Sequence, residues 1–381
     1  MSDRKSRQML RRVKELNKES VVVACGCYAQ VAKEEVEKIE EIDLVLGNNE
    51  KKEIVKFVEE YIIGKLEIAE IQDMMCQREY VDLGNVTYTE KTRAVIKVQD
   101  GCDRFCSYCI IPYARGIVRS RKPDSVLSEI NKIAKGGIKE VIITGIHVAS
   151  YGKDFKEEYR LIDLLEEINN VQGIERIRLS SIEPLLITEE FIKRLIKLEK
   201  VCHHFHLSLQ SGCDDTLKRM NRRYTTKDFR EIVQILRKYC KNVILTTDII
   251  VGFPEETEEE FKSTYEFLKE IKFYKMHVFK YSPRKGTKAA NLKNQIDGNV
   301  KDERSRCLLE LSDTYQEQYN KKYIGKEVEI LFEEPKNGNY QGHTKNYILA
   351  KTKNKIENNL ENMIVKGICV DAKKDNIIID I

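Results

Sequence analysis

The clearest pattern in the chain is an alternation of short apolar segments with longer amphipathic ones between residues 93 and 319. The apolar segments are typical of buried strands, and the longer ones carry the period of amphipathic helices. The expected strands are 94–99, 140–146, 176–182, 204–210, 243–253 and 275–281, and the helices include 124–135, 160–169, 188–199, 226–239 and 257–271. Strand–helix units in series wind into a parallel sheet with right-handed crossovers. Six units are fewer than the eight of a closed TIM barrel, so we predict a partial (β/α)6 TIM-like barrel in an α/β protein.

The segments on either side of this repeat have a different character. Residues 1–70 predict a partial α/β domain, and residues 71–92 show no sustained period and are expected to form a linker. The expected elements there are helices over 2–16, 32–41 and 49–62 and a strand over 20–25. From residue 320 to 381, short alternating strands over 326–334, 347–353, 362–371 and 376–381 are separated by Gly, Asn and Lys turns. We predict a small antiparallel barrel of about five strands, similar to an OB-like module.

Composition excludes few classes of function, but it indicates the cellular compartment and the state of the cysteines. No apolar run approaches the roughly 20 residues that a membrane span requires. The first ten residues, MSDRKSRQML, hold no apolar stretch of a secretion signal, so we expect a cytoplasmic protein. The 11 cysteines then predict free thiols and a metal site in place of disulfides. A net charge of +4 does not identify a nucleic-acid partner.

Three cysteines, Cys102, Cys106 and Cys109, directly follow the first strand of the repeat. In a parallel barrel the C-terminal ends of the strands carry the chemistry. Structural zinc takes four ligands, and neither a fourth cysteine nor a histidine stands nearby. An iron–sulfur cubane bound by three thiolates keeps one iron open for another ligand. We therefore predict a 4Fe–4S cluster, with a zinc site and incidental core thiols as the alternatives.

The flanking residues resemble a known family. The segments GCDRFCSYC, LSSIEP, HLSLQSG, DIIVGFP and YSPRKGTKAA are similar to those of the radical S-adenosylmethionine methylthiotransferases, most closely the tRNA enzymes acting on N6-threonylcarbamoyladenosine. YIGKEVEILFEE and GHTKNYILAK resemble the C-terminal TRAM module, and the resemblance covers essentially the whole chain. It implies that Cys102, Cys106 and Cys109 hold the cluster and that S-adenosylmethionine binds its open iron. One electron then cleaves the cofactor to methionine and a 5′-deoxyadenosyl radical.

The resemblance also implies a set of cofactor-binding residues. They are Tyr108, Gly145, Ser181, Glu183 and Arg223. Gly145 would let the backbone approach the cofactor's amino group, or would only form a turn. Ser181 and Glu183 would contact the ribose, since a carboxylate accepts hydrogen bonds from hydroxyls, or Glu183 would only shape a turn. Arg222 and Arg223 would pair with the cofactor carboxylate or an RNA phosphate, or remain surface charges.

The N-terminal segment departs from the family pattern. The family supplies three cysteines there to a second, auxiliary 4Fe–4S cluster, and Cys27 in GCYAQ corresponds to the last of them. Cys25 would be a substitute ligand or, as we expect, a buried thiol. The sequence begins inside the pattern, as an N-terminally truncated or mis-started enzyme would, so the second cluster is expected to be absent or labile. Glu255 stands where the family usually has Gly, in a loop where we expect little cost.

These observations predict a radical S-adenosylmethionine enzyme that adds a methylthio group to C2 of N6-threonylcarbamoyladenosine next to the tRNA anticodon. Single-stranded loops are the usual place for RNA readout by proteins. The expected partners are tRNA and an electron-donor protein, with no membrane and a monomeric chain. One alternative is methylthiolation of a ribosomal protein side chain, and another is a non-catalytic RNA-binding remnant of the family. The intact three-cysteine motif argues against the remnant.

Overall fold

The computed structural model describes residues 2–65, 71–82, 84, 92–335 and 338–381. These residues form two compact units. The first holds the described residues up to Gly84 together with Asp100–Phe105 and Cys109–Arg119, and the second holds residues 92–99, Cys106–Tyr108 and the described residues from Ser120 to Ile381. The expected linker over 71–92 lies partly outside the described residues. Within the described chain, no helix has the length and apolar character needed to cross a membrane. The cytoplasmic location stays a prediction.

The first unit is built around two short parallel strands, β1 (Val23–Cys25) and β2 (Leu44–Leu46). Its helices are α1 (Ser2–Leu16), α2 (Cys27–Val31), α3 (Lys33–Val36), the 3-10 helix η1 (Glu50–Glu53), α4 (Ile54–Ile62), the 3-10 helix η2 (Met74–Cys76) and α5 (Ile111–Arg115). The helix expected over 2–16 has those bounds. The helix expected over 32–41 is wrong beyond Val36, because the chain turns there and carries Ile39 into the core just before β2 begins.

The second unit contains the predicted repeat of strands. They are β3 (Arg93–Asp100), β5 (Glu140–Gly145), β6 (Arg176–Leu179), β7 (His204–Gln210), β8 (Ile244–Val251) and β9 (Lys275–Lys280), with β4 (Arg119–Ser120) beside β3. Parallel pairing joins β3 to β5 and β6, and β7 to β8 and β9. A bridge between Ile182 and Leu207 connects the two sets. The six strands therefore follow one another in chain order, and the prediction of a partial TIM-like barrel is confirmed.

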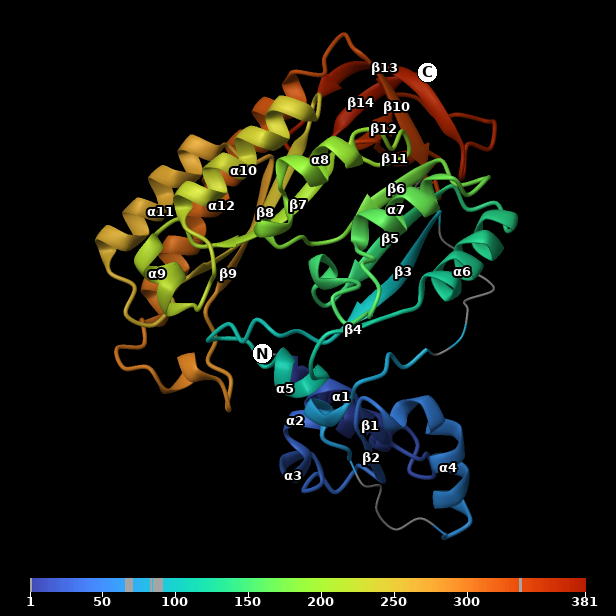
Figure 1. Ribbon diagram of the computed structural model, residues 1–381, viewed down its shortest axis with the longest axis vertical. Coiled ribbons are helices and arrows are strands. Elements are labelled where there is room, and N and C mark those ends of the chain that lie inside the picture. Colours follow the sequence, from blue (N-terminus) through green and yellow to red (C-terminus); the bar gives the residue numbers. More distant parts are fainter. Residues whose placement is uncertain (1, 66–70, 83, 85–91, 336–337) are drawn as a thin grey trace. The chain divides into compact units, whose positions relative to one another are not determined.

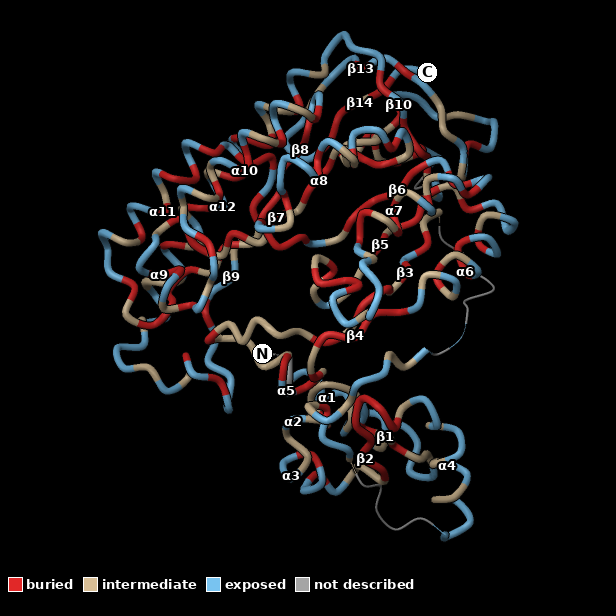
Figure 2. The backbone as a smooth tube through the Cα atoms, viewed as in Figure 1, coloured by how far each residue is buried: buried red, intermediate tan, exposed pale blue. Residues whose placement is uncertain are grey.

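Helices cover the outer side of these strands (Figure 1). They are α6 (Pro123–Lys135), α7 (Leu161–Asn169), α8 (Glu189–Leu195), α9 (Asp214–Arg219), α10 (Thr226–Tyr239), α11 (Glu258–Ile271) and α12 (Gly298–Lys321). Loops of the same unit contain the 3-10 helices η3 (Val148–Ser150), η4 (Pro184–Leu186) and η5 (Lys288–Asn291). Alternate residues of β7, Phe205 and Leu207, join Phe229 and Leu236 of α10 in one apolar core. Figure 2 shows that core along the strands, with exposed residues on the outer faces of the helices.

The C-terminal residues form a closed five-stranded barrel, as expected. Its strands are β10 (Glu327–Phe332), β11 (Gln341–Thr344), β12 (Leu349–Thr352), β13 (Ile364–Ala372) and β14 (Ile377–Asp380). Four pairings are antiparallel, but β12 and β14 pair in parallel, so the wholly antiparallel arrangement that the sequence suggested is wrong. Thr344 ends β11 and Asn346 lies in the turn before β12, where the Thr344 hydroxyl donates to Asn346 Oδ1 at 2.7 Å.

A buried cluster of charges lies at the N-terminal ends of β3, β5 and β6. Glu140 is fully buried, and its Oε1 accepts hydrogen bonds from Arg93 Nε at 2.8 Å and Arg178 Nε at 3.0 Å. Arg176 Nη1 lies 4.0 Å from Glu140 Oε2. Burial alone would raise the pKa of Glu140, but the charges of Arg178 and Arg93 hold it below its usual value. The carboxylate therefore stays ionised inside the protein.

The C-terminal barrel packs on the same cluster. Glu329 pairs with Arg176 and Glu333 pairs with Arg93, each at 2.8 Å. The guanidinium of Arg178 lies 4.3 Å from the centre of the Tyr347 ring, a cation–π contact. The small barrel therefore closes the N-terminal ends of the strands and leaves their C-terminal ends to other loops.

Glu255 adopts a left-handed backbone conformation, with φ at 66°. A non-glycine residue there costs about 1 kcal/mol, more than the sequence led us to expect, because its Cβ crowds the next carbonyl oxygen. Glu255→Gly should therefore raise the free energy of unfolding of the second unit by about 0.5–1 kcal/mol, part of the gain being offset by glycine's entropy in the unfolded chain. Urea unfolding followed by circular dichroism measures this change. Glu175→Gly, outside the positive-φ positions, is the control and should lower stability; equal decreases in both variants would contradict the assignment.

Candidate functional site

The three-cysteine loop, Gly101–Ile110, leads from the C-terminal end of β3 to α5. Gly101 has φ at 72°, and a Cβ there would lie 1.8 Å from the Ile117 carbonyl oxygen, so only glycine fits. Cys102 N–H then donates to the Gly116 carbonyl at 2.9 Å. Phe105 also has a positive φ, of 48°. These constraints fold the loop back on itself directly after the strand.

The boundary between the two compact units passes through this loop. Cys102 and Cys109 belong to the first unit, and Cys106 belongs to the second. Each cysteine is partly exposed, and no disulfide involves them within the described residues. Three thiol groups within eight residues, all reachable from solvent, are a donor set that fits an iron–sulfur cluster with one open iron. The ligand role of each residue stays a prediction.

The middle of the loop is held firmly in the second unit. Ser107 N–H donates to the Met220 carbonyl at 3.0 Å, and its hydroxyl donates to the Arg219 carbonyl at 2.8 Å. The Tyr108 ring packs edge-on against Phe253, with 6.4 Å between centroids. Tyr108 thus anchors the loop in an apolar cluster, and its predicted contact with the cofactor stays a prediction. The position of Cys106 is therefore set by hydrogen bonds on its C-terminal side.

Arg222 reaches Cys106 from the turn that follows α9. Its Nη1 lies 3.3 Å from Cys106 Sγ, and its Nη2 donates to the Ser208 carbonyl at 3.1 Å. Its Nε donates to the Tyr224 hydroxyl at 2.9 Å. Burial raises the pKa of Tyr224, so that phenol stays neutral. The sequence marked Arg222 only as a possible partner for a carboxylate or phosphate, since no spacing rule links residue 222 to residue 106.

The other predicted cofactor residues lie in loops at the C-terminal ends of strands or nearby. A Cβ on Gly145, at the end of β5, would lie 2.8 Å from Gln99 Oε1, so packing against β3 already requires glycine there. Ser181 is exposed, Glu183 is buried before η4, and Arg223 is exposed. The contacts of these four residues with a cofactor stay predictions.

Cys27, at the start of α2, lies among polar groups of the first unit. Arg115 Nε donates to Cys27 Sγ at 3.1 Å, and Asn48 Nδ2 lies 3.9 Å from the same sulfur. The expectation of a buried thiol at Cys25 is wrong. Cys25 is exposed, because Ala24 takes the inward position of β1 and the strand ends at the next residue. The two sulfurs therefore do not share one face of a continuing strand.

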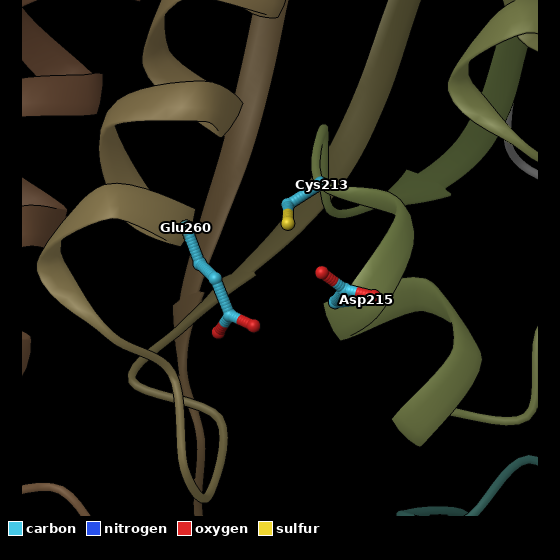
Figure 3. Close-up of side chains that lie close together, drawn as sticks. All are labelled: Cys213, Asp215 and Glu260. Carbon is cyan, nitrogen blue, oxygen red and sulfur yellow. The ribbon is translucent and has the colours of Figure 1, made fainter.

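Side chains of types that can bind a metal ion also lie close together between α9 and α11. Figure 3 shows Cys213, Asp215 and Glu260 close together, with ligand atoms within 4.8 Å of one another. Glu260 already accepts a hydrogen bond from Arg219 Nη1 at 2.7 Å and another from Thr257 N–H at 3.1 Å. Its carboxylate is therefore neutralised by an arginine and caps α11, so we interpret the group as a helix cap with an ion pair.

Comparison with known proteins gives matches along the chain. The description "Radical SAM superfamily" matches residues 96–268, and "Uncharacterized protein family UPF0004" matches residues 1–47. The threonylcarbamoyladenosine tRNA methylthiotransferase MtaB of Bacillus subtilis is 41% identical over 352 residues, covering 91% of this chain and 78% of that protein. A tRNA-2-methylthio-N(6)-dimethylallyladenosine synthase of Caldicellulosiruptor saccharolyticus is 37% identical over 330 residues, covering 85% of this chain and 69% of that protein.

A solved structure is similar in fold. It is the radical S-adenosylmethionine methyltransferase TsrM from Kitasatospora setae, with cobalamin and a [4Fe-4S] cluster bound. Its TM-score to this chain is 0.58 at 16% identity, over 75% of this chain and 61% of that one. At this identity the likeness supports the barrel architecture alone.

Proposed function

Because the chain belongs to the radical S-adenosylmethionine tRNA methylthiotransferases, a family that uses a 4Fe–4S cluster and S-adenosylmethionine, we propose that it adds a methylthio group to C2 of N6-threonylcarbamoyladenosine beside the tRNA anticodon. The observation that carries the proposal is the 41% identity to an enzyme of that name, which exceeds the 37% identity to the dimethylallyladenosine enzyme. Both relatives are named for tRNA, which favours tRNA over a ribosomal protein as the substrate. An electron-donor protein and a monomeric chain complete the proposal.

The residues of the β3–α5 loop have distinct roles in this proposal. Cys102, Cys106 and Cys109 bind the cluster, which when bound supplies the electron that cleaves S-adenosylmethionine. Gly101 gives the loop its turn, and Tyr108 anchors it. The chain thus positions three sulfur ligands at the C-terminal end of a strand, where a partial barrel places its reactions.

The remaining predicted residues would contact the cofactor or a second cluster. Gly145, Ser181, Glu183 and Arg223 come from segments at or near the C-terminal ends of the strands, and they would hold the amino, ribose and carboxylate parts of S-adenosylmethionine. For the auxiliary cluster the described residues supply one recognisable ligand, Cys27, whose sulfur already accepts a hydrogen bond from Arg115. One thiol does not make a three-cysteine set, so the proposal includes no step through that cluster.

The test uses anaerobically reconstituted protein with S-adenosylmethionine, dithionite, sulfide as the source of the sulfur atom, and one of two tRNAs. One tRNA carries N6-threonylcarbamoyladenosine and the other carries N6-dimethylallyladenosine. We expect the methylthio product, detected by mass spectrometry of the digested nucleosides, with the first tRNA only. A product with the second tRNA alone would overturn the substrate assignment. Formation of 5′-deoxyadenosine without any methylthio product would overturn the transfer step and leave the radical chemistry intact.

A further inference from the structure

Arg222, a partly buried cation next to Cys106, makes contacts that the proposed function does not yet use. Arg222 makes three hydrogen bonds, to the Ser208 carbonyl, the Tyr224 hydroxyl and the sulfur of Cys106. The carbonyl and the phenol are neutral. A guanidinium always carries its charge, and it binds most strongly where a hydrogen-bond partner is an anion. Of the three partners, only the cysteine sulfur becomes an anion when it binds iron.

We infer that Arg222 is a positioning residue that raises the reduction potential of the cluster by donating an N–H to the Cys106 thiolate. The inference rests on the proposed function, since it needs a cluster at that thiolate. A hydrogen bond to a ligand sulfur withdraws electron density from the cluster and stabilises the reduced form, which carries one more negative charge. The cluster would then accept its electron at a less negative potential.

The geometry favours arginine at this position over any other cation. The guanidinium is a rigid plane, and fixing two of its nitrogens sets the direction of the third. Ser208 at the end of β7 and Tyr224 fix Nη2 and Nε, and Nη1 then points at Cys106. The Tyr224 hydroxyl also donates to the Leu209 carbonyl at 2.8 Å, which ties it to the same strand. Lysine would keep the charge but lose this direction.

The test is a redox titration of the reconstituted protein, in which the reduced cluster is followed by electron paramagnetic resonance. In Arg222→Met the ratio of reduced to oxidised cluster at a fixed potential should fall about tenfold, which is a midpoint about 59 mV lower for a one-electron couple. Arg222→Lys should give a smaller decrease. Arg230→Met is the matched control, because Arg230 lies on α10 and its side chain bonds to Glu270; its midpoint should equal that of the unchanged protein.

A measurement on the unchanged protein guards against variants that fail to fold. With arginine labelled by ¹⁵N, the reduced cluster should show a hyperfine coupling to a guanidinium nitrogen, and Arg222→Lys should lack it. A full cluster content with an unchanged midpoint in Arg222→Met, or no ¹⁵N coupling in the unchanged protein, would overturn the inference. If the unchanged protein binds no cluster under anaerobic reconstitution, the proposed function itself fails. Iron and sulfide content therefore separates the two failures.

Discussion

Cys106→Ala is expected to abolish binding of the 4Fe–4S cluster and, with it, all reductive cleavage of S-adenosylmethionine. The loop offers three sulfur ligands, and a cubane left with two is no longer held against loss of iron. The variant should also leave the partly buried Arg222 without its sulfur partner. The measurement is iron and sulfide per chain after anaerobic reconstitution, together with 5′-deoxyadenosine formed after addition of dithionite. Both should fall to the level of the protein that was never reconstituted.

The matched control for this prediction is Cys307→Ala. Cys307 is also partly exposed, lies on α12 and packs against the main apolar core, far in sequence from the loop. Its removal should leave cluster content unchanged. A full cluster in Cys106→Ala, or an equal loss in Cys307→Ala, would remove the basis for assigning the loop as the ligand site.

Glu140→Gln is expected to destabilise the second unit by about 3–5 kcal/mol, because removing one partner of a buried ion pair leaves uncompensated charge. Removing this buried carboxylate's charge leaves the guanidinium groups of Arg93, Arg176 and Arg178 without their shared anion. The mutation removes little volume, so the loss is electrostatic. Urea unfolding, followed by circular dichroism and compared at the transition midpoint, measures it.

The control is Glu175→Gln, which breaks a pair with Lys139 at 3.4 Å in which the Glu175 side chain is 49% exposed. Pairs of this kind contribute about 0–1 kcal/mol, so stability should barely change. If Glu140→Gln lowered the free energy of unfolding no more than the control does, water would have to reach the three arginines. The structure would then be wrong at the junction between the barrel and the C-terminal module.

The barrel could be predicted from the sequence because several of its strands, such as β6 and β8, are buried along most of their length. Segments such as EVIITG and ILTTDIIV are rich in apolar and β-branched residues and are bounded by turns, so they can be recognised without any partner being known. Helix α12 was missed for the opposite reason. Its buried residues are the polar Arg304, Ser312, Gln316 and Asn320 and the apolar Leu308 and Tyr315. The polar ones bond elsewhere in the fold, as Ser312 does with the N–H of Met276 on β9, so apolar residues do not form a continuous stripe along the helix.

For the candidate site too, patterns of neighbouring residues could be predicted from the sequence, and contacts between residues far apart in it could not. The spacing of Cys102, Cys106 and Cys109 is a local pattern, and it predicted a loop at the end of a strand. The contact of Arg222 with Cys106 joins residues 116 positions apart, and it depends on the path of the chain after α9. Glu255 is an intermediate case. The resemblance to the family marked the position in the sequence, and the positive φ in the structure explains why Gly is usual there.

The small C-terminal barrel contacts the first residue of β3, and the three-cysteine loop begins directly after the last residue of the same strand. β3 runs from Arg93, which is bonded to Glu333 of the small barrel, to Asp100, two residues before Cys102. At a rise of 3.3 Å per residue, the strand acts as a spacer of roughly 25 Å. If the substrate is an RNA that touches both ends of this strand, it must extend at least that far, which a folded stem and loop can do and a mononucleotide cannot. The strand would then select such a substrate by its length before any base is read.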